Sequence, residues 1–219
     1  MLRGTRFGLA VVAVALLVAG CDPEPFEPDG AQATESRARS WTAIDRALAD
    51  VVGEREPIAR ARFDGCHTGL RNWQFNDEYA HECSVVGSLL APAAERDEVS
   101  EALQTLSRRI DELGCTATWR PLAYIDREYW AKYEDRPDYR PGRLPAAEYQ
   151  CGGFRITVSP TDPVTIKKKD VLVPAALIGL DDMRVDQRYP ADTVRRAESD
   201  GAAMLWVITA DSRYYVTKF

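Results

Sequence analysis

Histidine is scarce in this chain, since only His67 and His81 occur among its 219 residues. The sequence also lacks the short motifs of common catalytic and phosphate-binding sites: it has no Gly-x-Ser-x-Gly, no His-Glu-x-x-His and no glycine-rich phosphate loop. Val86-Gly87-Ser88-Leu89 lacks the second glycine of a nucleophile elbow, and no pattern places a serine beside either histidine. We therefore predict no catalytic residue and no cofactor.

A long hydrophobic run is missing as well. The main apolar stretch, residues 7–20, would span about 21 Å as a helix, which is short of the ~30 Å hydrocarbon core of a bilayer. A permanent transmembrane helix is therefore not expected. Positive charge is not in excess either, because the formal net charge is −6 and no basic helix is present. This balance argues against a nucleic acid as partner.

The N-terminus carries the pattern of an export signal. Arg3 and Arg6 precede the apolar stretch, and small residues then lead directly to a cysteine in Val18-Ala19-Gly20-Cys21. This arrangement resembles the lipobox of bacterial lipoproteins. The resemblance implies that residues 1–20 are a signal peptide and that Cys21 is diacylated on sulfur as the first residue of the mature chain. Two acyl chains are about the number needed for stable anchoring in a membrane.

Two segments follow the predicted lipid anchor. Residues 21–38 are rich in proline and acidic side chains, and we interpret them as the lipidated cysteine and a flexible tether. Residues 39–219 are long enough for one extracytoplasmic domain with a sizeable core. Within this domain we expect a long insertion at residues 125–148 and a C-terminal part, residues 160–219, that extends the same sheet.

Apolar spacing and turn residues predict the elements of this domain. Helices are expected at residues 41–52, at residues 92–113 with Pro92 at the start and Gly114 past the end, and at residues 192–199. Strands are expected at residues 58–63, 79–90, 115–124, 149–159 and 171–175, followed by a hairpin of residues 204–210 and 214–219 that turns at Asp211-Ser212. The order predicts an α+β fold with helices packed on one face of a mostly antiparallel sheet.

Four cysteines remain once Cys21 is assigned to lipid: Cys66, Cys83, Cys115 and Cys151. An even number in an exported chain favours two disulfides, and the absence of a Cys-x-x-Cys motif argues against a metal site. The first two expected strands would bring Cys66 and Cys83 to the same end of a hairpin, so this pairing is preferred. The remaining pair would lie at opposite ends of the next hairpin, roughly 20 Å apart at ~3.3 Å per residue. Cys66–Cys151 with Cys83–Cys115 therefore stays open, unless Gly152-Gly153 is a bulge that resets the register.

Aromatic and arginine side chains gather between Trp119 and Tyr149 in a long connection that also contains Pro137, Pro141 and Pro145. A connection of this length is uncommon unless it is functional or disordered. Exposed Tyr and Trp beside Arg suit recognition of sugars, peptides or proteins, because aromatic rings bury much area at little entropic cost. The alternative is that the rings only pack the loop onto the sheet. The candidate binding residues are Trp119, Tyr124, Tyr129, Trp130, Tyr139 and Arg140.

The lipobox-like motif, the acidic tether, the order of helices and strands and the paired cysteines are together similar to actinobacterial cell-envelope lipoproteins, including the LppA-like group. The resemblance implies a location on the extracytoplasmic side of the cell membrane and no particular activity. We expect a non-enzymatic binding protein whose partners are the membrane, through Cys21, and an envelope protein or cell-wall glycan. The alternative is a small envelope hydrolase. That alternative requires His67 or His81 within hydrogen-bond reach of a Ser, Cys or carboxylate in a cleft.

Overall fold

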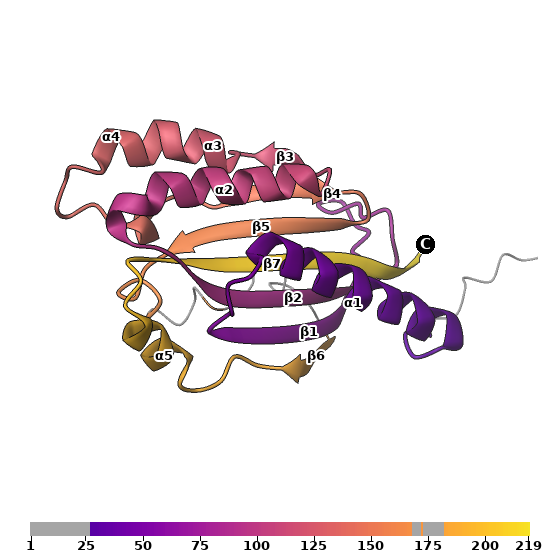
Figure 1. Ribbon diagram of the computed structural model, residues 1–219. Coiled ribbons are helices and arrows are strands. Elements are labelled where there is room, and N and C mark those ends of the chain that lie inside the picture. The colour runs from indigo at the N-terminus through magenta and orange to yellow at the C-terminus, as the bar shows by residue number, and fades with distance from the viewer. Residues whose placement is uncertain (1–26, 168–171, 173–181) are drawn as a thin grey trace, which may run out of the picture.

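The computed structural model describes residues 27–167, 172 and 182–219. Cys21 and the signal peptide therefore lie outside the described residues, as does the strand expected at residues 171–175, apart from Leu172. The described residues form one seven-stranded antiparallel sheet in the order β3-β4-β5-β7-β2-β1-β6 (Figure 1). The strands are β1 (Ala59–Thr68), β2 (His81–Ala94), β3 (Thr116–Trp119), β4 (Ala147–Cys151), β5 (Phe154–Thr161), β6 (Asp182–Gln187) and β7 (Met204–Thr217).

Helices α1 (Ala31–Val52) and α2 (Val99–Glu112) pack on one face of this sheet, so the fold has the expected α+β class and layering (Figure 1). A helical segment joins β3 to β4 beside α2, and a short helix precedes β7. These further elements are α3 (Leu122–Ile125), a π-helical turn (Asp126–Trp130), α4 (Ala131–Tyr133), a 3₁₀ turn (Pro141–Arg143) and α5 (Thr193–Asp200). A 3₁₀ turn (Arg96–Glu98) also leads into α2.

The core follows the two-residue period of the central strands. In β7, Trp206 and Ile208 belong to the main buried cluster together with apolar side chains of α1 and α2. The intervening Leu205 and Val207 belong to a smaller cluster that includes Ala197 of α5. The helical spacing of α2 predicted its buried face correctly, as shown by Val99, Leu103, Leu106 and Ile110.

A buried polar network ties the first half of α1 to the sheet. Asp64 of β1 is buried and receives a hydrogen bond from Tyr214 Oη at 2.9 Å, while Arg37 Nε lies 3.0 Å from its carboxylate. Arg37 also donates to Tyr214 Oη at 3.0 Å. Tyr214 is the extra residue of a bulge in β7, since Ser84 pairs with Arg213 and Cys83 with Tyr215. The bulge therefore coincides with this contact to the helix.

The start of α1 corrects the expected tether. The helix begins at Ala31 rather than near residue 40, so residues 31–38 are helical and not a flexible linker. Helix-favouring Ala, Gln, Glu and Arg occur in this stretch, and the buried Asp64 pairs with Arg37. The composition suggested a tether because it is polar, but a long-range ion pair and the buried Ala33 hold the first turns of the helix in place.

The boundaries of four expected strands also differ. β1 continues to Thr68, five residues past the expected end, and Pro92 lies inside β2 instead of opening a helix. The strand expected at residues 115–124 ends at Trp119, because Leu122 starts α3. The strand expected at residues 149–159 is two strands, β4 and β5, which turn at Gly152-Gly153, with Gly152 at a φ of 58° that favours glycine.

The predicted C-terminal hairpin is wrong, because β7 is one strand of 14 residues. Asp211 and Ser212 suggested a turn through their polarity. In the fold, Arg155 Nε donates to the Asp211 carboxylate at 3.0 Å, and Ser212 is buried with its hydroxyl 3.2 Å from the Gly153 carbonyl oxygen. β7 pairs with both β5 and β2, so the C-terminal part joins the main sheet at its centre.

Candidate functional site

Both disulfides lie where strands meet. Cys66 and Cys83 are directly opposed residues of β1 and β2, with a Cα–Cα distance of 4.0 Å, as the preferred pairing required. Cys115 is bonded to Cys151 with a Cα–Cα distance of 4.2 Å. The strand expected at residues 149–159 would place Cys151 near its start, too far from Cys115 for a disulfide. β4 ends there instead, so the antiparallel pairing brings Cys151 to the start of β3.

Part of the predicted aromatic binding region is core. Trp130 is only 1% exposed, and its ring centroid lies 6.1 Å from that of Tyr139. The Arg96 guanidinium carbon lies 5.3 Å from the centre of the Trp130 ring. Arg96 also donates hydrogen bonds to the backbone carbonyls of Glu134, Arg136 and Tyr139. These contacts fix the insertion to the domain. Trp130 is therefore a core residue and not the exposed binding residue that was predicted, while Tyr139 packs beside it and is partly buried.

The other part of the region forms a partly exposed cluster of rings around Arg120 at the sheet edge. Trp119 is 49% exposed at the end of the edge strand β3, and the Arg120 guanidinium carbon lies 4.4 Å from the centre of its ring. The same guanidinium carbon lies 5.7 Å from the Tyr129 ring centre. Tyr129 in turn meets Tyr124, which is 38% exposed, edge to face at 6.1 Å. We name Trp119, Arg120, Tyr124 and Tyr129 the Trp119 surface.

Arg120 has an unusual backbone. Its φ of 42° is the one positive value at a non-glycine residue among those the structure describes. Such a conformation costs roughly 1–3 kcal/mol and persists where the surroundings impose it. Here it lets the chain turn from β3 into α3 while the Arg120 side chain stays between two aromatic rings. Arg140, the remaining candidate, is exposed and precedes the 3₁₀ turn at Pro141.

Two titratable groups near this surface have shifted pKa values. Hydrogen bonds from Lys132 and Arg127 lower the pKa of Glu128, which is partly exposed and precedes Tyr129. Burial raises the pKa of Tyr139, and the neighbouring Tyr133 raises it further. Glu128 therefore stays ionised and paired with cations at neutral pH, while Tyr139 stays a neutral phenol.

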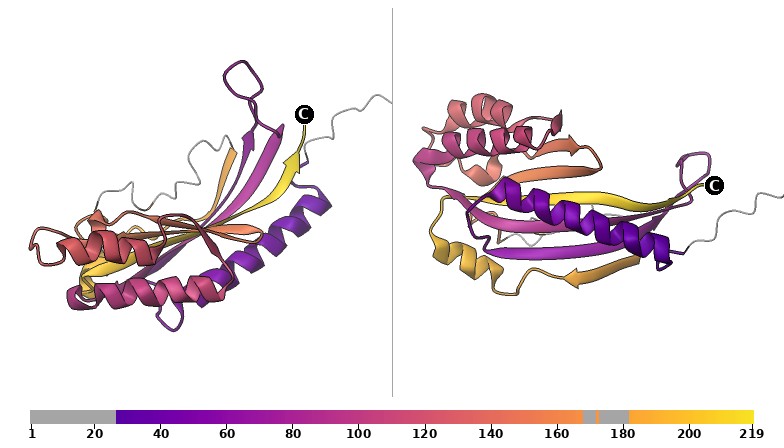
Figure 2. Two further views of the ribbon diagram at one scale, coloured as in Figure 1. Left: turned by 90° about the horizontal axis from the view of Figure 1, so that it is seen from above. Right: turned by 45° about the vertical axis from the view of Figure 1, so that its right-hand side comes forward.

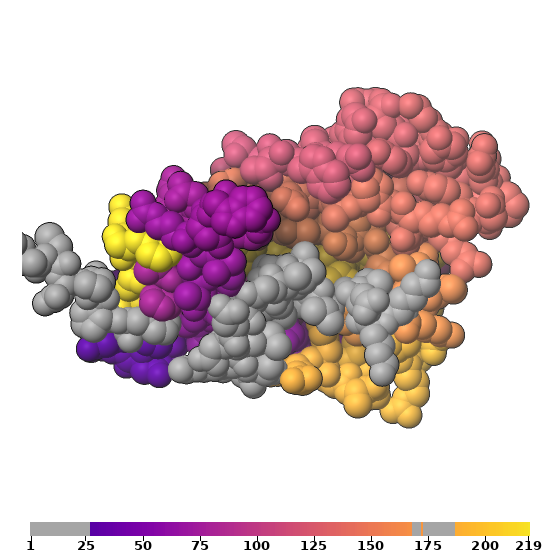
Figure 3. Space-filling model, turned by 180° about the vertical axis from the view of Figure 1, so that it is seen from behind, coloured from indigo at the N-terminus to yellow at the C-terminus, as the bar shows by residue number. Residues whose placement is uncertain are grey.

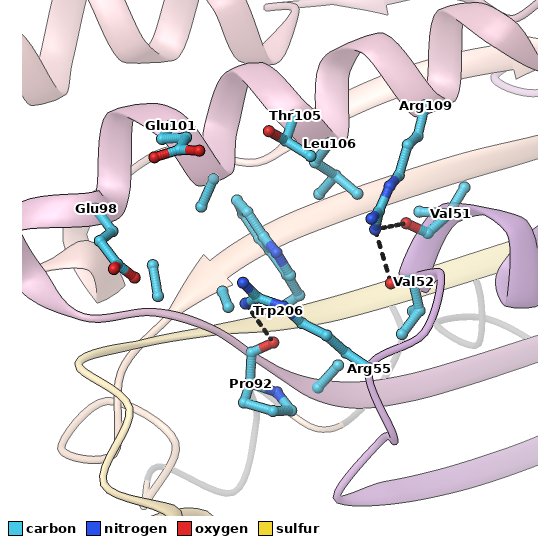
Figure 4. A pocket seen from close by; sticks show the side chains of 14 residues that line it. Val51, Val52, Arg55, Pro92, Glu98, Glu101, Thr105, Leu106, Arg109 and Trp206 are labelled. Atoms are coloured by element: carbon cyan, nitrogen blue, oxygen red, sulfur yellow. Dashed lines mark hydrogen bonds between the residues drawn. The ribbon is translucent and has the colours of Figure 1, made fainter.

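A pocket of about 250 Å³ opens between α1, α2 and the strands beneath them. Trp206 of β7 is part of its lining, as are Glu98 of the 3₁₀ turn before α2 and Glu101 of α2 (Figure 4). Its two arginines bind backbone: Arg109 donates to the Val51 and Val52 carbonyls at the end of α1 (Figure 4). Arg55 donates to the Pro92 carbonyl at 3.4 Å. Arg109 thus joins α2 to the end of α1, and Arg55 joins the segment after α1 to β2, so both arginines have a structural role.

The two histidines lie on the β1–β2 pair, away from this pocket. The register places His67 opposite Glu82, whose carboxylate receives a hydrogen bond from Arg213 at 3.1 Å. His81 Nδ1 lies 3.2 Å from Thr217 Oγ1. Neither histidine lines the α1–α2 pocket.

Over the described ranges, no group of three or more His, Cys, Asp and Glu residues is arranged to hold a metal ion. Within the same residues, no helix has both the length and the apolar character needed to cross a membrane. No family model, curated protein or solved structure matches the chain.

No sequence pattern singled out residues 69–80, yet the structure exposes three large apolar side chains there. Trp73 is 90% exposed, and Leu70 and Phe75 are about half exposed. The sequence did carry a signal for this exposed group. Three large apolar residues occur within six positions between two expected strands, and Asn72 among them suits a turn.

Proposed function

We propose that this chain is a lipid-anchored binding protein on the extracytoplasmic side of a bacterial cell membrane, and that it binds cell-wall glycan through the Trp119 surface. The lipobox-like sequence at Val18–Cys21 supports the anchor. The two disulfides, Cys66–Cys83 and Cys115–Cys151, support an oxidising compartment, because disulfides are rare in the reducing cytosol. Acylation at Cys21 is tested by mass spectrometry of the membrane-extracted protein, where an unmodified thiol would contradict it.

The observation that carries the binding proposal is the stacked and strained Arg120. Its guanidinium lies against the half-exposed Trp119 and the partly buried Tyr129, and its backbone adopts an unfavourable φ. Backbone strain of this kind is concentrated at functional sites, where it holds a side chain in the position that the function requires. The buried rings of the insertion need no such strain to pack.

The chemistry of this surface fits a glycan. Aromatic rings present flat apolar faces that pack against the C–H face of a sugar ring, and the guanidinium offers up to five N–H donors to hydroxyl or carboxylate oxygens. Trp119 and Tyr124 remain accessible for such contacts. The hydrolase alternative gains no support from the α1–α2 pocket, since neither histidine is part of its lining.

Co-sedimentation with insoluble peptidoglycan tests the proposal. The acylated full-length protein in detergent should pellet with the polymer, and Trp119→Ala should weaken binding roughly tenfold, as expected for losing ~1.5 kcal/mol of ring stacking. Trp73→Ala is the matched control, because it removes another exposed indole, in the loop between β1 and β2 and outside the Trp119 surface, and it should bind like the wild type. Equal pelleting of Trp119→Ala and the wild type would contradict the proposal. A Trp119-dependent crosslink to an envelope protein, without pelleting, would replace the glycan by a protein partner.

A further inference from the structure

The loop between β1 and β2 is an ordered hairpin extension. Gly69 N donates to the Ala80 carbonyl at 2.8 Å. Two further hydrogen bonds join Leu70 and Asp77: Asp77 N donates to the Leu70 carbonyl at 3.0 Å, and Leu70 N donates to the Asp77 carboxylate at 2.7 Å. Arg71 and Asn76 then form an isolated bridge. The hairpin thus continues the two strands beyond the sheet, and it projects from the body of the molecule (Figure 2).

The tip of this hairpin is a tight turn that holds Trp73 outward. Asn72 N donates to the Phe75 carbonyl at 2.7 Å, and the Asn72 side-chain oxygen receives the backbone N–H groups of Gln74 and Phe75 at 2.8 and 3.0 Å. Such an Asn-based turn is locally stable. A fixed turn therefore presents an indole that is 90% exposed, with Leu70 and Phe75 behind it. We name Leu70, Trp73 and Phe75 the hairpin tip.

The hairpin projects from the end of the molecule where the chain enters the domain. Glu27 N donates to Tyr215 Oη at 3.3 Å, and Ala80 N at the base of the hairpin donates to the Thr217 carbonyl at 2.7 Å, two residues along the same strand. The first turns of α1, the hairpin and the C-terminus share this end (Figures 2 and 3). Glu27 follows Cys21 by six positions, so the chain between them can span at most about 20 Å.

We propose that the hairpin tip inserts into the interface of the lipid bilayer and gives the domain a second membrane contact beside the acylated Cys21. The inference rests on the anchor in the proposed function and goes beyond it by assigning the orientation of the domain. Trp prefers the boundary between headgroups and acyl chains, where its ring is apolar and its N–H can bond to polar groups.

A bilayer fits this tip better than a protein partner does. Three side chains on a narrow turn offer far less area than the roughly 800 Å² per partner of a standard protein interface, whereas shallow insertion into lipid needs only a small apolar projection. Charged side chains surround the base of the hairpin. The Arg71 guanidinium carbon lies 5.4 Å from the centre of the Phe219 ring, and Lys218, Asp77 and Glu78 line the same small hollow. The cations can meet anionic headgroups, while the Asp77 carboxylate is already engaged by Leu70 N.

Quenching of tryptophan fluorescence by brominated lipid tests the proposal. The acylated full-length protein is reconstituted into vesicles of phosphatidylglycerol and phosphatidylcholine, with or without bromine on the acyl chains. Of the five tryptophans, Trp130 and Trp206 are buried, Trp41 is partly buried, and Trp73 and Trp119 are exposed. We expect brominated vesicles to quench the wild type, Trp73→Phe to lose most of that quenching, and Trp119→Phe to keep it. Phe at position 73 keeps the tip apolar, so only the reporter is removed.

Three results would overturn the inference. The wild type could show equal emission in brominated and plain vesicles, or Trp73→Phe could be quenched as much as the wild type. Trp73 could also be shielded at high protein density without bromine quenching, which would indicate a second copy of this chain as the occupant. The full-length Cys21→Ser protein added to the same vesicles separates the two proposals. If Cys21 proves not to be acylated, the anchor fails, and Trp73-dependent quenching of the added protein still supports the lipid contact.

Discussion

At the scale of single residues, Tyr214 couples the stability of the fold to alkaline pH. Burial is the main cause that raises the pKa of Tyr214 to about 12 from an ordinary value of 10.0, and the nearby Asp64 raises it further. The folded state thus holds this proton more tightly than the unfolded state does. The resulting stabilisation is fully present below pH 10 and is lost as pH rises toward 12.

We predict that the unfolding free energy of the wild type falls by about 2–3 kcal/mol from this group between pH 10 and pH 12, at 1.36 kcal/mol for each unit of pKa shift. Tyr214→Phe should be less stable at pH 8, because it leaves the buried Asp64 carboxylate without that hydroxyl donor, and its stability should fall less steeply across the alkaline range. Urea unfolding at several pH values measures both slopes. Parallel slopes for the two proteins would show that the Tyr214 proton is not the cause.

We predict that replacing Trp130 and Trp119 with alanine has different effects on the unfolding free energy. Trp130→Ala should lower the unfolding free energy by about 3–5 kcal/mol, because it empties a fully buried site beneath the Arg96 side chain. Trp119→Ala should change it by less than about 1 kcal/mol, since the ring is half exposed and loses mainly its contact with Arg120. Denaturant titration with the disulfides intact compares them. A large loss for Trp119→Ala would reassign that ring from binding to packing.

At the scale of elements, the contact of α1 with β2 depends on a missing side chain. A Cβ atom at Gly87 would lie 2.7 Å from Ile44 Cγ2 and 2.9 Å from Leu48 Cδ1, which is closer than such atoms approach. We predict that Gly87→Ala lowers the unfolding free energy by about 1–3 kcal/mol by pushing α1 from the sheet. Gly153→Ala is the matched control, because a Cβ atom there would have no neighbour within 4 Å. Thermal unfolding of both variants checks this, and equal melting temperatures would contradict it.

The elements also show what sequence patterns can and cannot reveal. The buried face of α2 could be predicted, because Leu103, Leu106 and Ile110 follow a local 3.6-residue period. β7 could not, because Asp211 and Ser212 are stabilised in a strand by partners from β5 and its preceding turn, more than 50 positions away. The same limit applies to the candidate site. Composition located the aromatic region, but only the fold divides the buried Trp130 from the exposed Trp119.

At the scale of the whole molecule, β7 is the strand that joins the two parts of the sheet. β3, β4 and β5 lie on one side of it, and β2, β1 and β6 lie on the other. The strand nearest the C-terminus therefore completes the centre of the sheet, and non-local pairing of this kind forms late and slowly. α1 and α2 cover the junction from one face, and residues of both sides contribute to one buried cluster. This arrangement favours a single cooperative unit, as expected for one domain.

Leu89→Ala tests that cooperativity across β7. Leu89 is buried in β2 opposite Ile208 of β7, which pairs in turn with Val158 of β5. The substitution should cost about 2–5 kcal/mol. If the sheet opens as one unit, the opening free energy measured by amide hydrogen exchange should fall by the same amount in β2 and in β5, although β5 makes no strand pairing with β2. Wild-type protection of Phe154–Thr161 in this variant would mean that the β3–β4–β5 part unfolds independently and that the chain holds two units. The exposed hairpin should exchange fast in both proteins, because its opening needs none of the core.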